Sequence, residues 1–200
     1  TGIRKATAKA DFMPRPGRAG IRQLFFEAST QYVTDLDGRT LDWMVIASPL
    51  GLQTESGDEL RLEWVPQFER LDEPFEVQDG IVIPAGDYRY TAWIAEVETA
   101  QRRRWVAQLE ARWGSFYDGD LTRLEAELVL KPSPHLLVAA EGEWSRGELP
   151  AGSFTAKVLA GRLEVNCTPQ LGWSNLVQYD TDPRELGFPT RLRWRVRPAL

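Results

Sequence analysis

The chain has 200 residues, 42% of them hydrophobic, and a formal net charge of -5. This length suits one domain with a sizeable core, and the apolar content excludes intrinsic disorder. The negative charge gives no electrostatic basis for binding nucleic acid. No run approaches the ~18 apolar residues of a transmembrane helix, but a transmembrane strand needs only ~9–11 alternating residues. The composition therefore leaves both a soluble domain and a membrane barrel open.

Residues 1–20 show no clear periodicity and carry five basic residues among proline and glycine. We expect this segment to be a linker or lead-in, followed by one β-domain over residues 21–200. The chain begins at Thr1 without an initiator methionine, so we expect a processed chain or a fragment from which any targeting signal has been removed.

From Ile21 onward the hydrophobic pattern has a period of two, which only strands produce. In residues 60–68, for example, Leu62 and Trp64 share one face while Arg61 and Glu63 share the other. The pattern predicts about ten antiparallel strands, at roughly 22–33, 41–53, 60–68, 88–97, 104–113, 123–130, 136–144, 154–166, 171–179 and 191–197. Within 154–166 the apolar residues change parity, so we expect a β-bulge at Gly161.

The connections between these strands alternate in length. Short turns are expected at 55–58, 98–101, 131–134 and 168–170, and longer loops at 69–87, 114–120, 145–152 and 180–190. We expect the longest of these, 69–87, to be a partly ordered extracellular cap. Short turns on one rim and longer loops on the other are typical of outer-membrane barrels.

Alternation alone fits either a soluble β-sandwich, with its apolar side inward, or an outer-membrane barrel, with its apolar side outward. Tryptophan placement favours the barrel, because Trp105 and Trp113 bracket one strand as two interfacial belts would. Seven of the eight tryptophans lie on the apolar parity and are the predicted membrane-interface aromatics: Trp43, Trp64, Trp105, Trp113, Trp144, Trp173 and Trp194. We therefore predict an antiparallel up-and-down β-barrel of the outer-membrane type, with a soluble β-sandwich or barrel as the alternative.

The opposite parity carries arginine and glutamate together, which can pair across a small lumen. The residues predicted to form this lumen charge network are Arg61, Glu63, Glu110, Arg112, Arg123, Glu125, Glu127, Glu141, Glu143 and Arg193. Exposed charges on a soluble sheet would give the same pattern. The network therefore supports the barrel without deciding for it.

Several spaced stretches resemble the C-terminal region of DUF5916 proteins. They are residues 32–38, 68–75, 83–88, 114–120, 131–136 and 176–179, for example Gly114-Ser-Phe-Tyr-Asp-Gly-Asp120. The resemblance implies a domain like an outer-membrane barrel, which in that family usually follows a carbohydrate-binding family 9-like domain. That domain is absent from this chain, so sugar binding is not carried over. The family's hydrolase label is not carried over either, because no catalytic residue set supports it.

The residues indicate little chemistry of their own. Cys167 and His135 are single, so they cannot form a zinc site, and His135 lies in a predicted turn without a nucleophile elbow around it. The pairs Glu125/Glu127 and Glu141/Glu143 are each ~6.6–7 Å apart along a strand, a spacing that an inverting glycosidase could use. Charge pairing or solvation is the simpler interpretation. Residues 69–87 hold several acids, but in no EF-hand spacing.

Together these observations predict a non-enzymatic domain in the bacterial outer membrane, without a cofactor, metal or nucleic-acid partner. Its expected partners are outer-membrane lipid and a carbohydrate-binding module or other subunits, which it would anchor or present. The alternatives are a soluble binding or interaction module in the periplasm or outside the cell, and a glycoside hydrolase.

Overall fold

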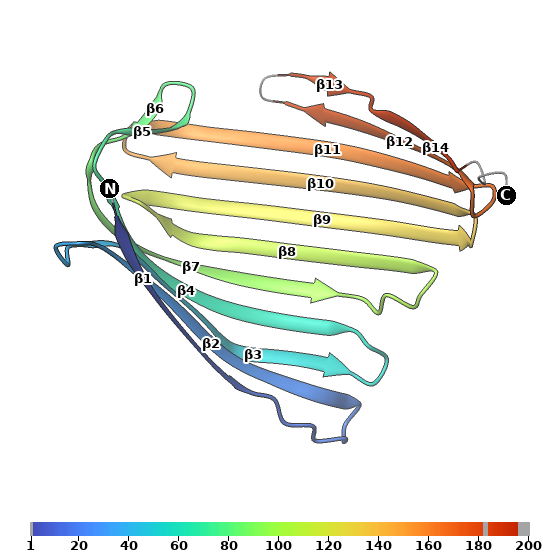
Figure 1. Ribbon diagram of the computed structural model, residues 1–200, viewed down its shortest axis with the longest axis horizontal. Coiled ribbons are helices and arrows are strands. Elements are labelled where there is room, and N and C mark those ends of the chain that lie inside the picture. Colours follow the sequence, from blue (N-terminus) through green and yellow to red (C-terminus); the bar gives the residue numbers. More distant parts are fainter. Residues whose placement is uncertain (1, 182–183, 196–200) are drawn as a thin grey trace, which may run out of the picture.

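The computed structural model describes residues 2–181 and 184–195, and these form an all-β structure (Figure 1). The strands are β1 (Ile3–Phe12), β2 (Ile21–Asp35), β3 (Thr40–Thr54), β4 (Glu59–Leu71), β5 (Phe75–Gln78), β6 (Ile81–Ile83), β7 (Gly86–Glu98), β8 (Trp105–Phe116), β9 (Gly119–Ser133), β10 (Leu136–Leu149), β11 (Gly152–Asn166), β12 (Leu171–Asp180), β13 (Leu186–Gly187) and β14 (Thr190–Trp194). No helix in the described residues is long and apolar enough to cross a membrane.

Twelve of these strands form one antiparallel up-and-down sheet in the order β1-β2-β3-β4-β7-β8-β9-β10-β11-β12, with β13 and β14 both paired to the far side of β12. Each of the ten predicted strands overlaps one of them, although residues 196 and 197 of the last lie outside the described part. The all-β, antiparallel, up-and-down prediction is thus confirmed.

The sheet is open. It curves strongly, and its two edges, β1 and β12–β14, lie well apart (Figure 1). Among the described residues β1 pairs only with β2, and no strand joins β14 to β1. Closure into a barrel is therefore not seen within residues 2–181 and 184–195. A sandwich is not seen either, because the only other sheet in the described part of the chain is the small β5–β6 hairpin.

The segment expected to be a linker contains β1, which pairs with β2 over its whole length, from Ile3 opposite Asp35 to Phe12 opposite Phe26. Its alternation is real but weak, because Ala6, Ala8 and Ala10 supply most of its apolar side. Alanine is depleted in strands and is a poor signal for one, and the basic residues between the alanines therefore led to the prediction of a linker.

Two connections predicted as longer loops are turns of two residues each, 117–118 and 150–151. Glycines suggested loops there, but Gly119 and Gly147 belong to strands β9 and β10, at points where residues of the adjacent turn and strand come very close. A Cβ on Gly119 would overlap the carbonyl oxygen of Glu148, and one on Gly147 would overlap the Phe154 ring. These glycines therefore serve packing within the sheet.

The expected bulge at Gly161 is also absent, because β10 and β11 pair without interruption from Leu136 opposite Val165 to Leu149 opposite Gly152. A register shift lies instead in β3, between Ala47 and Leu50. Pro49 falls in this shift, where its missing N–H costs no ladder hydrogen bond.

Candidate functional site

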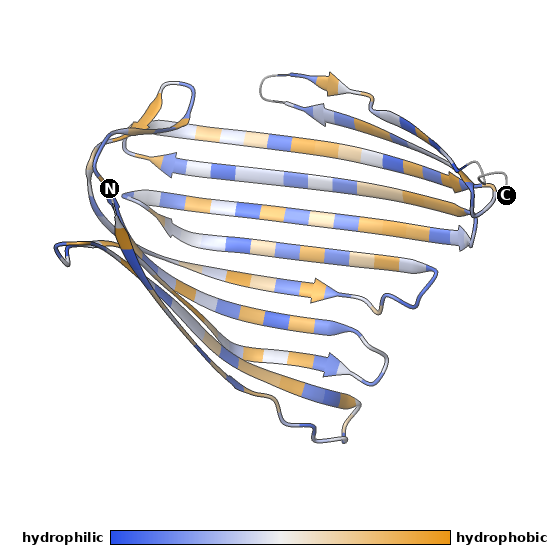
Figure 2. Ribbon diagram, in the orientation of Figure 1, coloured by the Kyte–Doolittle hydropathy of each residue, from blue (hydrophilic) through white to orange (hydrophobic). Residues whose placement is uncertain are grey.

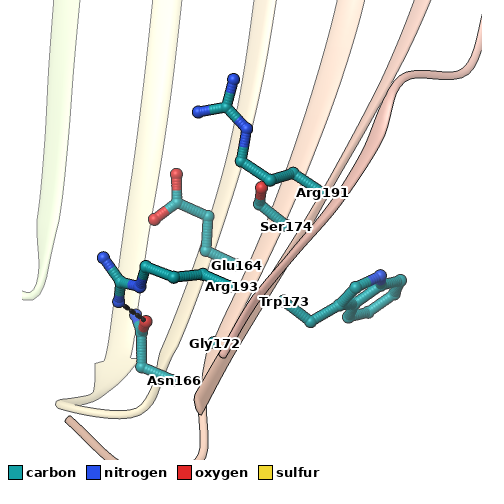
Figure 3. Close-up of a pocket in the computed structure, with 7 residues that line it drawn as sticks. All are labelled: Glu164, Asn166, Gly172, Trp173, Ser174, Arg191 and Arg193. Atoms are coloured by element: carbon teal, nitrogen blue, oxygen red, sulfur yellow. Dashed lines mark hydrogen bonds between the residues drawn. The ribbon is translucent and has the colours of Figure 1, made fainter. Parts of the chain in front are cut away.

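The two faces of the sheet differ in the polarity and in the exposure of their side chains. In Figure 3 Glu164, Arg191 and Arg193 point toward the neighbouring strands, whereas Trp173 points away from them. We call the side of Glu164, Arg191 and Arg193 the inner face and the side of Trp173 the outer face. Alternating hydrophilic and hydrophobic bands along β7–β11 show the same division across the sheet (Figure 2).

On the outer face the apolar side chains are exposed. In β9, Leu124 and Leu128 are each 43% exposed, while the inner-facing Leu121 and Val129 of the same strand are 9% and 8% exposed. Outer-facing Leu109 on β8 is 50% exposed. In the described residues the apolar parity is therefore not enclosed between stacked sheets. Because adjacent strands share this pattern, the exposed apolar side chains form a continuous surface.

All eight tryptophans lie on this outer face. Trp64, Trp93 and Trp113 form a cross-strand row on β4, β7 and β8. The sequence interpretation had left Trp93 out of the set, and its two register partners correct that omission. Trp43 stacks on Phe68 beyond this row, at 6.5 Å between ring centroids.

The tryptophans gather in two bands. The first contains Trp43, Trp64, Trp93, Trp113 and Trp144, and the second contains Trp105, Trp173 and Trp194. Trp105 and Trp113 lie at opposite ends of β8. Their eight-residue separation corresponds to ~26 Å along a strand, or ~20 Å along a barrel axis if the strands tilt by ~40°. This is close to the ~25 Å apolar band of an outer-membrane barrel.

The first band also slopes across the sheet. Trp43 is level with Phe68 of β4, and Trp144 is level with Leu62, six residues nearer the opposite end of that strand. The second band steps in the same direction from Trp105 to Trp194. Strands that are tilted to a common axis produce this parallel slope.

The inner face carries the predicted charges, and the structure brings most of them together. Glu110, Glu125 and Glu143 lie in one cross-strand row on β8, β9 and β10, which Glu96 of β7 extends. Like charges placed directly opposite destabilise a sheet unless cations lie between them. Arg112, Glu127 and Glu141 occupy adjoining rows of the same strands.

Arginines neutralise part of this acidic surface. Arg123 lies 3.7 Å from Glu125 and 3.4 Å from Glu143, and Arg162 lies 3.6 Å from Glu127. Arg162 and Glu164, 3.7 Å apart, share this face although they were not among the predicted members of the network.

The remaining three predicted members are placed differently. Arg61 of β4 lies opposite Glu96 and so extends the same cross-strand row. Glu63, two residues along β4, accepts a hydrogen bond from Ser48 Oγ at 3.4 Å. Arg193 is on the edge strand β14, where it donates to the Asn166 side chain at 3.3 Å (Figure 3). The ten predicted residues therefore share the inner face but do not form one network.

The long loop at residues 69–87 is better ordered than expected. Its β5–β6 hairpin lies beside the start of β11, across the ends of β8–β10 from the strands that carry it (Figure 1). Ile81 and Ile83 are buried, and a Cβ on Gly152 would touch Ile81 at 3.5 Å. The hairpin therefore covers the inner face at this rim.

An aromatic cluster anchors the base of the hairpin. Phe75 of β5 lies 6.3 Å from the Tyr117 ring, and Tyr90 lies 5.0 Å from it, centroid to centroid. The hydroxyls of Tyr90 and Tyr117 both donate to Glu69, at 3.1 and 2.8 Å. Such a network fixes the position of the loop.

His135 and the acidic side chains of the described residues have mainly structural contacts. His135 Nδ1 lies 2.8 Å from the carbonyl oxygen of Asn166, so this histidine ties two adjacent turns together. No group of three or more metal-ligating side chains occurs among the described residues. Within the hairpin, Glu76 accepts the N–H of Gly80 at 2.9 Å.

No protein-family model, curated protein sequence or solved structure matches this chain. The resemblance to DUF5916 proteins therefore stays a prediction from the sequence stretches themselves.

Proposed function

We propose that this chain forms part of the wall of an outer-membrane β-barrel, with its outer face against lipid and its inner face toward the lumen. The observation that carries the proposal is the exposed apolar outer face, bounded by two sloping tryptophan bands. In water this surface would remain unburied, whereas each large aliphatic side chain moved into lipid contributes ~1.5–3 kcal/mol. Tryptophans at the two borders suit the two membrane interfaces.

The inner face supports anchoring rather than catalysis or conduction. Arg123 lies between Glu125 and Glu143, and the contact of Arg162 with Glu127 repeats this arrangement. Carboxylates neutralised in this way fill space and balance charge, and the β5–β6 hairpin covers one end of the inner face. The proposed role is therefore to hold a larger assembly, such as the sugar-binding module implied by the resemblance, at the bacterial outer membrane.

Depth-dependent fluorescence quenching tests the proposal. The chain is reconstituted into vesicles whose lipids carry bromine either near the headgroup or near the acyl-chain end. The native tryptophans should be quenched more by shallow bromine. A Leu109→Trp variant, placed between the bands, should gain emission that deep bromine quenches. The matched variant Gln108→Trp, on the inner face, should gain emission that neither lipid quenches. Equal quenching of the two added tryptophans, or failure of the native chain to enter vesicles, would contradict the proposal.

A further inference from the structure

The sheet has two free edges. All residues of β1 and all residues of β14 are exposed. Within the described residues, β1 has no strand beside it on the edge away from β2, and β14 has none on the edge away from β12. Free edge strands present rows of unpaired N–H and C=O groups that accept another strand. In a bilayer each unsatisfied backbone group costs several kcal/mol, so lipid-exposed edges have to be paired.

Strand direction limits how these edges can be paired. Every neighbouring pair in the sheet is antiparallel, and β13 and β14 share one side of β12, so the twelve strands occupy eleven positions. The first and eleventh positions, β1 and β14, consequently run in the same direction. Direct pairing between them would be parallel, whereas bacterial barrels of one chain have an even number of antiparallel strands. An odd number of additional strands is needed between these edges.

A second copy of this chain does not meet that need. If two copies had the same orientation in a membrane, β1 of one would meet β14 of the other in parallel. Antiparallel contacts between identical edges, β1 with β1 and β14 with β14, would require one copy to be inverted across the membrane. Inversion would put the β5–β6 hairpins of the two copies on opposite sides of the membrane, whereas membrane barrels keep their longer loops on one side. The missing strands therefore differ from this chain's own edges.

Basic side chains predominate on the inner side of both edges. Lys5 and Lys9 lie on the inner side of β1, where Lys9 is already paired with Asp11 and Glu27, and Arg191 and Arg193 lie on the inner side of β14. Within the described part of the chain, the side chains of Lys5 and Arg191 make no hydrogen bond or ion pair. In Figure 3 the Arg191 guanidinium points away from the other labelled groups. Elsewhere on the inner face arginine faces glutamate on a neighbouring strand, as Arg123 faces Glu143.

The outer-facing side chains at the edges continue the apolar surface. On β1 they include Ala8, Ala10 and Phe12, and on β14 they are Leu192 and Trp194. A strand that extends the sheet must therefore be apolar on one parity and complement basic residues on the other.

From these observations we propose that β1 and β14 are docking edges for amphipathic antiparallel strands, odd in total number, that carry aliphatic residues outward and Asp or Glu inward. This inference rests on the proposed membrane function, because membrane orientation is what excludes a second copy.

Peptide docking in detergent micelles tests the edges without a bilayer, so its outcome is separate from the vesicle experiment. The probe is a synthetic strand of about ten residues with alternating Leu and Glu and a photoreactive group at its N-terminus. Crosslinks should map near Phe12 of β1 and near Trp194 of β14, as antiparallel pairing requires. A matched Leu/Lys peptide should bind about tenfold more weakly, because like charges would then face each other.

Charge reversal at the edges gives the specific control. The double variant Lys5→Glu with Arg191→Glu should reverse the preference, so that the Leu/Lys peptide binds more tightly. Lys157→Glu, on the outer face of the interior strand β11, should leave the preference unchanged. Crosslinks near Ile3 and Thr190, equal binding of both peptides, or crosslinks between β1 strands of two chains would each overturn the proposal.

Discussion

The outer and inner faces invert the usual relation between polarity and exposure. On β9 the leucines facing outward are about five times as exposed as the inward Val129, while charged residues share the less exposed side. Curvature explains the inversion, because side chains converge on the inner face and diverge on the outer face. The comparison shows that an alternating pattern defines two faces but does not say which of them is enclosed.

The largest loss of stability is expected from a charge placed on the outer face. Leu109→Arg would place a cation in the middle of the apolar band, which in a bilayer costs ~2–4 kcal/mol. Urea unfolding from lipid vesicles measures this loss of free energy of unfolding. Gln108→Arg, the next residue on the inner face, is the matched control, since its partners include Glu96 and the opposing Glu127. Equal losses from both variants would show that the two faces do not meet different surroundings.

A second comparison uses glycines on the two faces. Gly119→Ala on the inner side would force a methyl group against the Glu148 carbonyl and to 2.9 Å from the Cα of Leu149. We expect a loss of about 1–3 kcal/mol in unfolding free energy, as for an overpacked interior. Gly161→Ala on the outer side meets nothing within 4 Å and should be neutral or slightly stabilising. Thermal and denaturant unfolding of both variants would reveal whether the crowding is confined to the inner face.

The sequence predicted the strands well because most of them alternate large apolar residues with charged ones. It could not predict β1, whose apolar side is mostly alanine, or the short turns beside Gly119 and Gly147. In those positions glycine relieves a close approach between strands, and that need depends on register rather than on local sequence. The β5–β6 hairpin was missed for a similar reason, because the buried Ile81 lies beside Gly152 of β11, which is distant in the sequence.

The sequence predicted which charged residues share the inner face, but not which of them form ion pairs with one another. The parity of Arg123, Glu125 and Glu143 follows from the period of two, so their common face was predictable. The partner of Glu127 was not, because Arg162 reaches it from β11, across the intervening strand β10. Such contacts depend on sheet curvature, which an alternating pattern does not encode.

A smaller effect tests the charges of the inner face. Arg123→Gln would leave Glu125 and Glu143 opposite each other without their shared cation. Because these side chains are partly exposed, we expect a loss of about 0.2–1 kcal/mol that shrinks at high salt. Arg146→Gln removes an outer-facing arginine that pairs only with Glu148 of its own strand, and should cost less. Denaturant unfolding at low and high ionic strength distinguishes the two, and a salt-independent loss at Arg123 would argue against charge pairing.

The smallest expected effect lies at the rim, where the two faces meet. Asp58, in the β3–β4 turn, accepts hydrogen bonds from Ser56 Oγ at 2.5 Å, the Ala100 N–H at 3.0 Å and the Arg103 guanidinium at 2.7 Å. These contacts lower the pKa of Asp58 from 3.8 to about 2 and link two neighbouring turns.

Because the folded-state pKa lies below the unfolded value, the stability from Asp58 is complete above pH 4 and is lost as the pH falls toward 2. Asp58→Asn should remove that part of the pH dependence, which denaturant unfolding between pH 5 and pH 2 would measure. Asp37→Asn, in the turn between β2 and β3 on the opposite rim, is the control for loss of a turn carboxylate. If Asp58→Asn leaves the acid dependence unchanged, these hydrogen bonds do not hold the two turns together.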